Sequence, residues 1–418
     1  MQLKTDIAIL VGLELPNHKY KMEDSLNELK FLAKALNIET KEKVIQKLNK
    51  VNPRFYVGKG KVSEIKNLID IHEATIVIFD DPLSPAQINN LEKELDIQVI
   101  DRSFLILSIF AERAQSRKSI LEVSLAQKQY MLPRLVGLGK SLSRQGGGTY
   151  NAKGPGETKL EMDRRRLLKD ISNIKNELKE ISLEYETSRK KRLESNIPVV
   201  ALVGYTNVGK SSLMNTLSKK LSESDEEVFE KDMLFATLDT KVKRLRKENY
   251  PPFLLIDTVG FIRKLPKELI SSFESTLMDV IDADLLIIVS DGSNFEDYQI
   301  NETLNVLNRI KADHIPKLYV FTMLDKVKNY NKPIIDEDYH FISNITHENI
   351  DELITSIYGN IYLNSKMVNL HLKFEDGNIL DYIKKNSTII SINYNEEGYV
   401  IKTILSEKDL LRFNNYIK

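Results

Sequence analysis

The first hundred residues alternate short apolar runs with stretches of helical periodicity. Three runs are typical of strands: Ile7–Val11, Thr75–Phe79 and Gln98–Asp101. Residues 23–36 carry leucines at helical spacing, and Ser84 followed by Pro85 is the start signal of a helix that reaches about Leu95. Strands that alternate with helices predict a parallel sheet, so we expect an N-terminal α/β subdomain over residues 1–102.

Residues 103–195 have a different pattern, which predicts an antiparallel helical hairpin. We expect one long helix over residues 103–132, ended by Pro133, and a second helix over residues 160–192. The second helix carries apolar residues at the spacing of a coiled-coil seam: Leu160, Leu167, Ile171, Ile174, Leu178, Ile181 and Tyr185. Residues 137–158 between the helices are basic and rich in glycine and serine, so we expect a long loop at the hairpin tip.

Residues 196–362 return to the alternation of strands and helices. The strand-like runs are Val199–Val203, Phe253–Asp257, Leu285–Ser290 and Leu318–Thr322. Residues 365–418 predict a small α+β domain, in which strands over 388–394 and 399–405 flank a hairpin turn at Asn395–Gly398. The expected fold class is therefore α/β, with a mostly parallel sheet flanked by helices in the third of four domains.

The composition is that of a globular protein and excludes several chemistries. The chain has 418 residues, enough for about three domains, and its 60 basic and 60 acidic residues give no net charge. That balance excludes a uniformly basic nucleic-acid binder but not a local basic patch. The absence of cysteine excludes disulfides, thiolate catalysis, zinc fingers and iron–sulfur clusters. We find no signal peptide, and the longest apolar run, 285–289, is too short to span a membrane, so we expect a cytoplasmic protein.

A phosphate-binding loop lies between the strand at 199–203 and a helix predicted over Ser212–Leu221. Residues 204–211 read Gly-Tyr-Thr-Asn-Val-Gly-Lys-Ser, which matches the pattern G-x-x-x-x-G-K-[ST]. In such a loop backbone N–H groups face phosphate oxygens, Lys210 reaches the β and γ phosphates, and the Ser211 hydroxyl binds Mg²⁺. A chance glycine-rich turn is the alternative. The residues expected to bind nucleotide here are Gly204, Tyr205, Thr206, Asn207, Val208, Gly209, Lys210, Ser211 and Ser212.

A second loop, Asp257-Thr258-Val259-Gly260, follows the next apolar strand. An aspartate at this place can hold Mg²⁺ through a water molecule, and the N–H of Gly260 can contact the γ-phosphate. The D-x-x-G pattern is common by itself, but its position one strand after a phosphate-binding loop makes it a strong indication. We expect all four residues to bind nucleotide.

A third loop, Phe235-Ala236-Thr237-Leu238-Asp239, lies between the first two. A threonine in such a switch loop can bind Mg²⁺ through its hydroxyl and sense the γ-phosphate. We prefer Thr237 to Thr240 for this role, and a solvent-facing threonine is the alternative. Lys210, Thr237 and Gly260 are the expected catalytic residues.

The expected base-recognition loop departs from the usual pattern. GTPases with this phosphate loop carry N-K-x-D after a strand, and the aspartate accepts hydrogen bonds from guanine. Here the residues are Thr322-Met323-Leu324-Asp325, so the aspartate is present but the asparagine and lysine are replaced. A later loop, Ser343-Asn344-Ile345, stands at the usual S-A-x position. We expect these loops to bind guanine; an Asp325 that is only a loop carboxylate is the alternative.

The loops, taken in order, resemble those of the translation-factor-like branch of small GTPases, and further segments resemble the HflX family. These segments are Arg54–Lys61, Phe79–Gln87, Asp101-Arg102, Leu132–Leu135, Ser143–Gly148, Gly154–Thr158 and Glu161–Arg166. The resemblance covers residues 1–360. It implies a GTP-binding and GTP-hydrolysing protein that associates with the large (50S) ribosomal subunit, and some members split ribosomes under stress. The departures at Thr322, Met323 and Asn344 indicate a divergent member.

The residue after Gly260 bears on the rate of hydrolysis. Many GTPases place a glutamine there to orient the attacking water, whereas this chain has Phe261. We expect hydrolysis to be slow in isolation and to need help from the ribosome. In some GTPases that lack the glutamine, an asparagine at the position of Asn207 helps to seat K⁺; a loop-stabilising asparagine is the alternative.

The predicted hairpin tip is basic. Residues 134–169 contain nine basic and three acidic residues, on a glycine-rich stretch that can approach RNA phosphates closely. A solvated linker is the alternative. The residues expected to contact ribosomal RNA are Arg134, Lys140, Arg144, Lys153, Lys159, Arg164, Arg165 and Arg166.

Two other functions stay open at this point. One is a nucleotide-gated RNA-binding module in which turnover matters little, which Phe261 favours. The other is an ATP-specific P-loop enzyme, which the departures at Thr322 and Met323 allow. The C-terminal residues 365–418 carry no catalytic motif and are expected to form an interaction domain. Nothing in the sequence indicates an obligate dimer, so we expect a monomer.

Overall fold

The computed structural model describes most of the chain as two compact units. The described residues are 6–16, 20–142, 155–194, 197–221, 241–248, 250–258, 260–264, 280–293, 297–326, 337–363 and 365–418. Unit 1 holds the described residues up to Ser182 together with 262–264, and unit 2 holds the other described residues. The four predicted domain ranges stay a prediction, because this division is coarser. Among the described residues, no helix is both long and apolar enough to cross a membrane.

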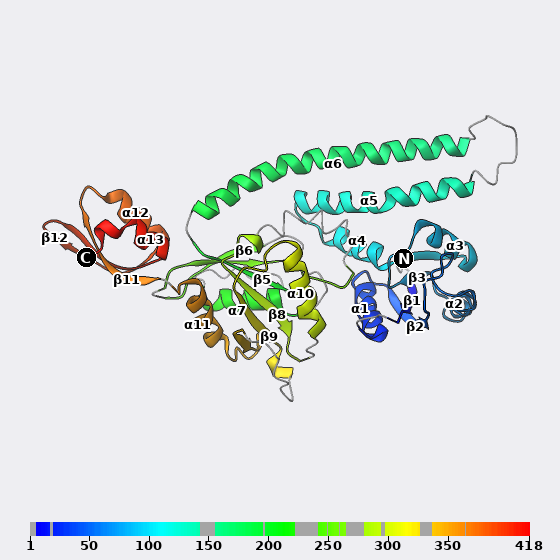
Figure 1. Cartoon of the computed structure of the whole chain (residues 1–418), viewed down its shortest axis with the longest axis horizontal. Helices are drawn as coiled ribbons and strands as arrows, with labels where there is room; N and C mark the ends of the chain where they lie inside the picture. Colours follow the sequence, from blue (N-terminus) through cyan, green and yellow to red (C-terminus); the bar gives the residue numbers. More distant parts are fainter. Residues whose placement is uncertain are drawn as a thin grey trace, which may run out of the picture. The chain divides into compact units, whose positions relative to one another are not determined.

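Unit 1 begins with a parallel sheet, as the alternating pattern predicted (Figure 1). Its strands lie in the order β2-β1-β3-β4. They are β1 (Ile7–Glu14), β2 (Glu39–Lys47), β3 (Ile76–Phe79) and β4 (Gln98–Asp101). The connecting helices are α1 (Met22–Ala35), α2 (Lys59–His72) and α3 (Pro85–Leu95). The helix signal at Ser84 is confirmed, because the Ser84 hydroxyl accepts a hydrogen bond from Gln87 N and Ser84 N donates to the Gln87 side chain.

The helical part of unit 1 differs from the prediction in two ways. The predicted helix over 103–132 is two helices, α4 (Arg102–Arg113) and α5 (Arg117–Leu142). The break occurs because Ala114 is extended and the Ser116 hydroxyl accepts from Ser119 N, which starts a new helix. Pro133 lies inside α5 and does not end it.

The turn around Pro133 is held by Arg134. Its guanidinium donates to the carbonyl oxygens of Tyr130 and Leu83 at 2.8 and 3.1 Å and lies over the Tyr130 ring. It also forms an ion pair with the buried carboxylate of Asp101 at 3.1 Å. These contacts stabilise the helix on both sides of a residue that lacks an N–H donor.

The second helix of the hairpin, α6 (Pro155–Glu194), is longer than predicted and lies beside α5 (Figure 1). The seam is confirmed over its central part, where apolar residues of the two helices pack together: Leu121, Leu125, Leu132, Leu167, Ile171, Ile174 and Leu178. Helix also occupies both ends of the range 137–158 that was predicted as loop, up to residue 142 and from residue 155, and residues 143–154 lie outside the described part of the chain.

Unit 2 contains the mostly parallel sheet that the sequence predicted. Its described strands lie in the order β10-β9-β8-β5-β7-β6. They are β5 (Val199–Gly204), β6 (Lys241–Leu245), β7 (Phe253–Asp257), β8 (Leu285–Asp291), β9 (Lys317–Thr322) and β10 (Tyr339–Phe341). Helices α7 (Lys210–Leu221), α10 (Asp297–Arg309) and α11 (Ile350–Ile361) flank it, together with a short 3-10 turn η1 (Leu324–Lys326). Only β6 is antiparallel among these strands.

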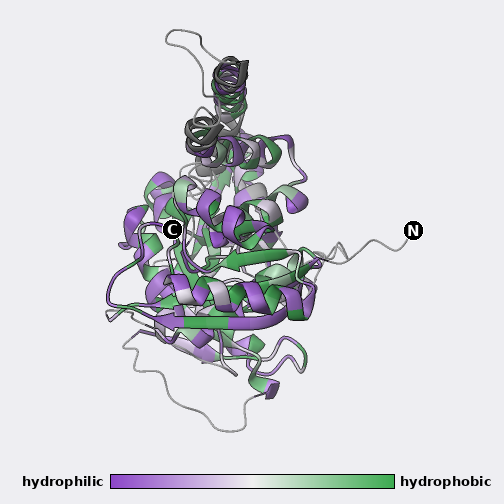
Figure 2. Ribbon diagram, turned by 90° about the vertical axis from the view of Figure 1, so that its right-hand side faces the viewer, coloured by the Kyte–Doolittle hydropathy of each residue, from purple (hydrophilic) through white to green (hydrophobic). Residues whose placement is uncertain are grey.

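This strand order fixes where a ligand can bind. In the sheet, β5 lies between β7 and β8. Strands β6 and β7 lie on one side of β5 and the later strands β8, β9 and β10 lie on the other side, so the direction in which strands are added reverses at β5. In such sheets ligands bind at the carboxyl ends of the strands, at the point of reversal. Strands β5, β7, β8 and β9 are buried along nearly their whole length, as expected for a sheet covered on both faces. Figure 2 shows that helices of the chain carry both hydrophilic and hydrophobic residues.

The C-terminal residues form a small antiparallel sheet with the order β11-β13-β12. Its elements are β11 (Lys366–Lys373), α12 (Gly377–Asn386), β12 (Thr388–Asn395), β13 (Gly398–Leu405), α13 (Glu407–Arg412) and η2 (Asn414–Tyr416). The predicted hairpin is confirmed, and the Asn395 side chain accepts hydrogen bonds from Glu397 N and Gly398 N in its turn.

A buried charge cluster lies at the carboxyl end of β3 in unit 1. The fully buried guanidinium of Arg102 contacts Asp80 at 2.8 Å, and the Ser25 hydroxyl donates to the same carboxylate at 2.8 Å. Lys264, in the short segment that belongs to unit 1, forms ion pairs with Asp80 and Asp81 at 2.5 Å. This cluster ties four separate parts of the chain together: α1, the end of β3, the start of α4 and the segment of Lys264.

Candidate nucleotide-binding site

The predicted phosphate loop connects β5 to α7 at the point of strand reversal. Gly204 ends β5 with a φ of 150°. A Cβ atom on Gly204 would lie 2.2 Å from the carbonyl oxygen of Val289, so no side chain fits there. The loop then turns into α7, which begins at Lys210, and the N-terminus of a helix favours an anion.

Lys210 is buried inside this loop. Its ammonium group donates to the carbonyl oxygens of Gly204 and Tyr205 at 3.2 and 2.6 Å. Burial lowers the pKa of Lys210 to about 8, against the opposing attraction of Asp257. A buried cation with few compensating charges is suited to bind an anion such as phosphate.

Ser211, in the first turn of α7, meets Asp257, the last residue of β7. The Ser211 hydroxyl donates to the Asp257 carboxylate at 2.7 Å, and this carboxylate is fully buried. Hard oxygen donors of this kind suit Mg²⁺, which is usually bound by one or two protein groups together with phosphates and water. The described residues contain no cluster of three or more His, Cys, Asp or Glu side chains that could hold a metal alone. The pair therefore fits a nucleotide-bound Mg²⁺.

Gly260 lies directly over the phosphate loop. A Cβ atom on Gly260 would come within 2.8 Å of both the Lys210 ammonium and Thr206 Cα. The next residue, Phe261, is bonded to the loop through its backbone, since Phe261 N donates to Gly204 O and Phe261 O accepts from Thr206 N. The Phe261 ring is buried, so it offers no hydrogen bond to an attacking water. In the same loop, the Thr258 hydroxyl donates to Leu202 O at 2.7 Å.

The base-recognition loops come together at the carboxyl ends of β9 and β10. The Ser343 hydroxyl donates to Asp325 at 2.7 Å and accepts from Ile345 N, which orients the carboxylate. Thr322 is fully buried and its hydroxyl donates to Val208 O at 2.7 Å. Met323 has a φ of 59° and lies between the end of β9 at Thr322 and the 3-10 turn that begins at Leu324. Sequence reasoning missed the tie from Thr322 to the phosphate loop, because a backbone carbonyl carries no sequence signal.

Several predicted site residues lie outside the described part of the chain. They are Phe235, Ala236, Thr237, Leu238, Asp239, Val259, Arg144 and Lys153. Lys140 and Lys159 lie in α5 and α6, but their side chains are not described. Arg164, Arg165 and Arg166 are exposed on α6. Arg134 makes the internal contacts given above, and its predicted contact with RNA stays a prediction.

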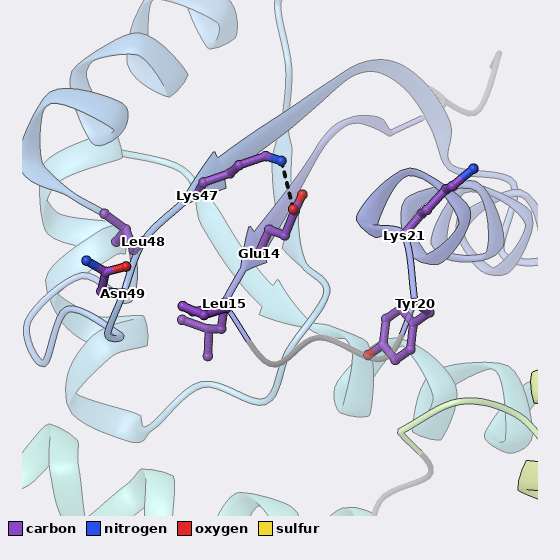
Figure 3. A pocket seen from close by; sticks show the side chains of 8 residues that line it. Glu14, Leu15, Tyr20, Lys21, Lys47, Leu48 and Asn49 are labelled. Atoms are coloured by element: carbon purple, nitrogen blue, oxygen red, sulfur yellow. Dashed lines mark ion pairs between the residues drawn. The ribbon is translucent and has the colours of Figure 1, made fainter.

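Unit 1 has a separate open pocket at the carboxyl ends of β1 and β2 (Figure 3). Its volume is about 650 Å³, and an ion pair between Glu14 and Lys47 at 2.8 Å forms part of its lining. Tyr20 and Lys21 line another part of it. None of the predicted nucleotide-site residues lines this pocket.

The fold and the loops define a P-loop GTPase. Three family models match consecutive parts of the chain: "GTP-binding GTPase N-terminal" over residues 23–111, "GTP-binding GTPase Middle Region" over 113–192 and "50S ribosome-binding GTPase" over 199–323. The chain is 38% identical to GTPase HflX of Caldanaerobacter subterraneus subsp. tengcongensis over 94% of this chain and 90% of the relative. It is 39% identical to GTPase HflX of Escherichia coli over 79% of this chain and 76% of that one. The chain belongs to the HflX family of GTPases.

Solved structures include a GTP-binding protein from the archaeon Sulfolobus solfataricus in complex with GDP. It is 24% identical, with a TM-score of 0.43, and the match covers 85% of this chain and 98% of that one.

Proposed function

We propose that this GTPase is a nucleotide-controlled switch that binds the large ribosomal subunit in its GTP state. The observation that carries the proposal is the convergence of Lys210, Ser211 and Asp257 at the reversal point of the unit 2 sheet. The description of one matching family model, a 50S ribosome-binding GTPase, and the three exposed arginines of α6, Arg164, Arg165 and Arg166, support the choice of partner. The same proposal includes dissociation or rescue of ribosomes under stress. It also places the protein in the cytoplasm as a monomer.

The chain's own residues would act as follows. Lys210 exchanges its loop carbonyl partners for the β and γ phosphates, and Gly260 N–H binds the γ-phosphate. Ser211 would hold Mg²⁺ directly and Asp257 through water, and Thr237, which lies outside the described residues, is the further proposed ligand. When bound, Mg²⁺ neutralises charge on the phosphate oxygens. Asp325, held by Ser343, accepts hydrogen bonds from the guanine ring.

Hydrolysis by the isolated chain would be slow, because Phe261 cannot orient water. The ribosome would supply the missing group that orients the attacking water, since the ribosome is the proposed partner of the GTP state. A second candidate, an RNA-binding module in which turnover matters little, is favoured by the same residue. Phosphate release measured with and without ribosomes separates the two functions: stimulation supports the switch, and slow release that ribosomes leave unchanged supports the module.

The proposal is tested by co-sedimentation of the chain with 50S subunits in GTP, GDP and a non-hydrolysable GTP analogue. We expect retention with GTP and the analogue and loss with GDP. Equal retention in all three nucleotides would contradict a switch. Failure to bind any guanine nucleotide would contradict the function as a whole.

Replacement of Arg164, Arg165 and Arg166 by glutamate is expected to weaken 50S binding about 10- to 100-fold and to leave GTP affinity unchanged. All three side chains are exposed on α6, and phosphate contacts dominate affinity for RNA. Binding is measured by sedimentation at two salt concentrations. The control is the double change Lys175→Glu and Lys179→Glu on the same helix, both exposed. A parallel fall in GTP affinity would show that the arginines support the fold instead.

Potassium dependence tests the proposed role of Asn207. If its carboxamide helps to seat K⁺, hydrolysis should be about tenfold faster in KCl than in NaCl at equal ionic strength. Asn207 is exposed and has a φ of 62°, which glycine adopts without strain. Asn207→Gly should therefore remove the potassium effect and keep the loop. Identical rates in both salts would mean that Asn207 only shapes the loop.

A further inference from the structure

Thr322 and Asn344 approach the same point of the phosphate loop from two different strand ends. A Cβ atom on Gly209 would lie 3.5 Å from the Thr322 hydroxyl and 3.5 Å from the Asn344 amide nitrogen. Thr322 ends β9, and Asn344 follows β10. Both residues belong to unit 2, as does Asp325, which follows Thr322 by three positions in the sequence.

The hydroxyl of Thr322 is already committed to the protein. It donates to Val208 O at 2.7 Å, with Ser290 O as a longer second acceptor at 3.2 Å. A hydroxyl has one hydrogen to donate, and Thr322 is fully buried. The Thr322 hydroxyl therefore links β9 to the phosphate loop. The Thr322 side chain has no N–H group that could donate a hydrogen bond to a base.

The carboxamide of Asn344 is in the opposite situation. Its oxygen is buried and has no hydrogen-bond partner among the described residues. An unsatisfied buried polar atom is costly, and a bound ligand is one reason for a protein to keep it. The neighbouring residue, Ser343, holds the Asp325 carboxylate, and the Asn344 amide nitrogen lies close to Gly209.

We propose that the Asn344 carboxamide recognises the O6 and N7 edge of guanine, the task that Thr322 cannot perform. Guanine presents two donors, N1–H and N2–H, which suit the acceptor-only carboxylate of Asp325. Its O6 and N7 are acceptors and require a donor. Rotation of the carboxamide by 180° exchanges its oxygen and nitrogen, and the N–H₂ group that then lies where the unpartnered oxygen was is that donor. This inference rests on the proposed guanine-nucleotide binding and names the residue that specifies the base.

The test compares GDP with two analogues, 7-deaza-GDP, which lacks N7, and 6-thio-GDP, which has a weaker acceptor at position 6, by calorimetry. The full chain should bind at least one analogue about tenfold more weakly than GDP. Asn344→Ala should lower GDP affinity about tenfold and remove that penalty. Asn344→Asp, which keeps the shape but has no donor, should also bind GDP weakly.

Asn360→Ala is the matched control, since that exposed amide bonds only within α11 and should leave every affinity unchanged. Unchanged GDP affinity in both Asn344 variants, with the analogue penalty retained, would overturn the assignment. Tighter binding of ADP than GDP would also overturn it. If the unmodified chain binds neither GDP nor GTP, the proposed function fails instead of the base assignment.

Discussion

Replacement of Lys210 by alanine is expected to lower GTP affinity by at least about 30-fold, which corresponds to about 2 kcal/mol or more. The ammonium group is buried in the phosphate loop, where two carbonyl oxygens hold it at 3.2 and 2.6 Å. Without it the β and γ phosphates lose their cation in a site shielded from solvent. Hydrolysis should fall at least as much, because the transition state places further charge on the same oxygens.

The measurement is calorimetry with GTP and Mg²⁺, followed by phosphate release under saturating nucleotide. Lys220→Ala on the same helix is the control, because Lys220 forms only a surface ion pair with Asp351. Wild-type affinity in Lys210→Ala would place the triphosphate elsewhere in the protein.

The second large effect is expected in unit 1, where Asp80→Asn should reduce the free energy of unfolding by about 3–5 kcal/mol. The change removes the carboxylate that contacts the fully buried Arg102 at 2.8 Å, so that Arg102 keeps the more distant carboxylate of Glu28 at 3.5 Å. Lys264 loses one of its two carboxylate partners. Urea unfolding monitored by circular dichroism measures the loss. Glu177→Gln, which breaks an exposed ion pair with Arg117, is the control and should cost at most about 1 kcal/mol.

The carboxylate of Asp80 also makes the free energy of unfolding depend on pH. Burial raises the pKa of Asp80, but the charges of Arg102 and Lys264 and the hydrogen bonds it accepts lower the pKa more, to about 2. The ionised form is therefore more stable in the folded state, and its contribution is complete above about pH 4 and lost as the pH falls towards 2. The stability difference between wild type and Asp80→Asn should be constant from pH 5 to 7 and shrink below pH 4. A difference that stays constant down to pH 2 would refute this.

The sequence was most informative where the structure depends on local patterns. The phosphate loop matched because its two glycines, lysine and serine lie within the short stretch 204–211, and the strands predicted for the two larger sheets matched because they are mostly apolar runs. Strands β2 and β10 were not predicted, since β2 is mostly charged and polar and β10 has only three residues. The edge strand β6 was missed, because Lys241–Leu245 alternates charged and apolar residues and pairs antiparallel at the end of the sheet. Such a strand is defined by its partner and not by its own hydrophobicity.

Contacts between distant residues could not be derived from the pattern. The predicted contact of Arg134 with RNA rests on its charge, and no sequence pattern indicates that its guanidinium also binds Asp101 and Leu83, which are far from it along the chain. The position of Pro133 inside α5 depends on those contacts. Similarly, the bond from Thr322 to Val208 joins residues 114 positions apart. These are tertiary interactions that no window of sequence contains.

The loops that form the nucleotide site leave the sheet at β5, β7, β9 and β10, so the ligand would touch residues from Gly204 to Asn344. A molecule held by so many separate segments stabilises the domain like a cross-link, because unfolding any one of these strands would release it. Guanine nucleotide at one hundred times its dissociation constant would add about 2.7 kcal/mol to the folded state. Heat resistance of unit 2 would then follow the cell's supply of guanine nucleotides.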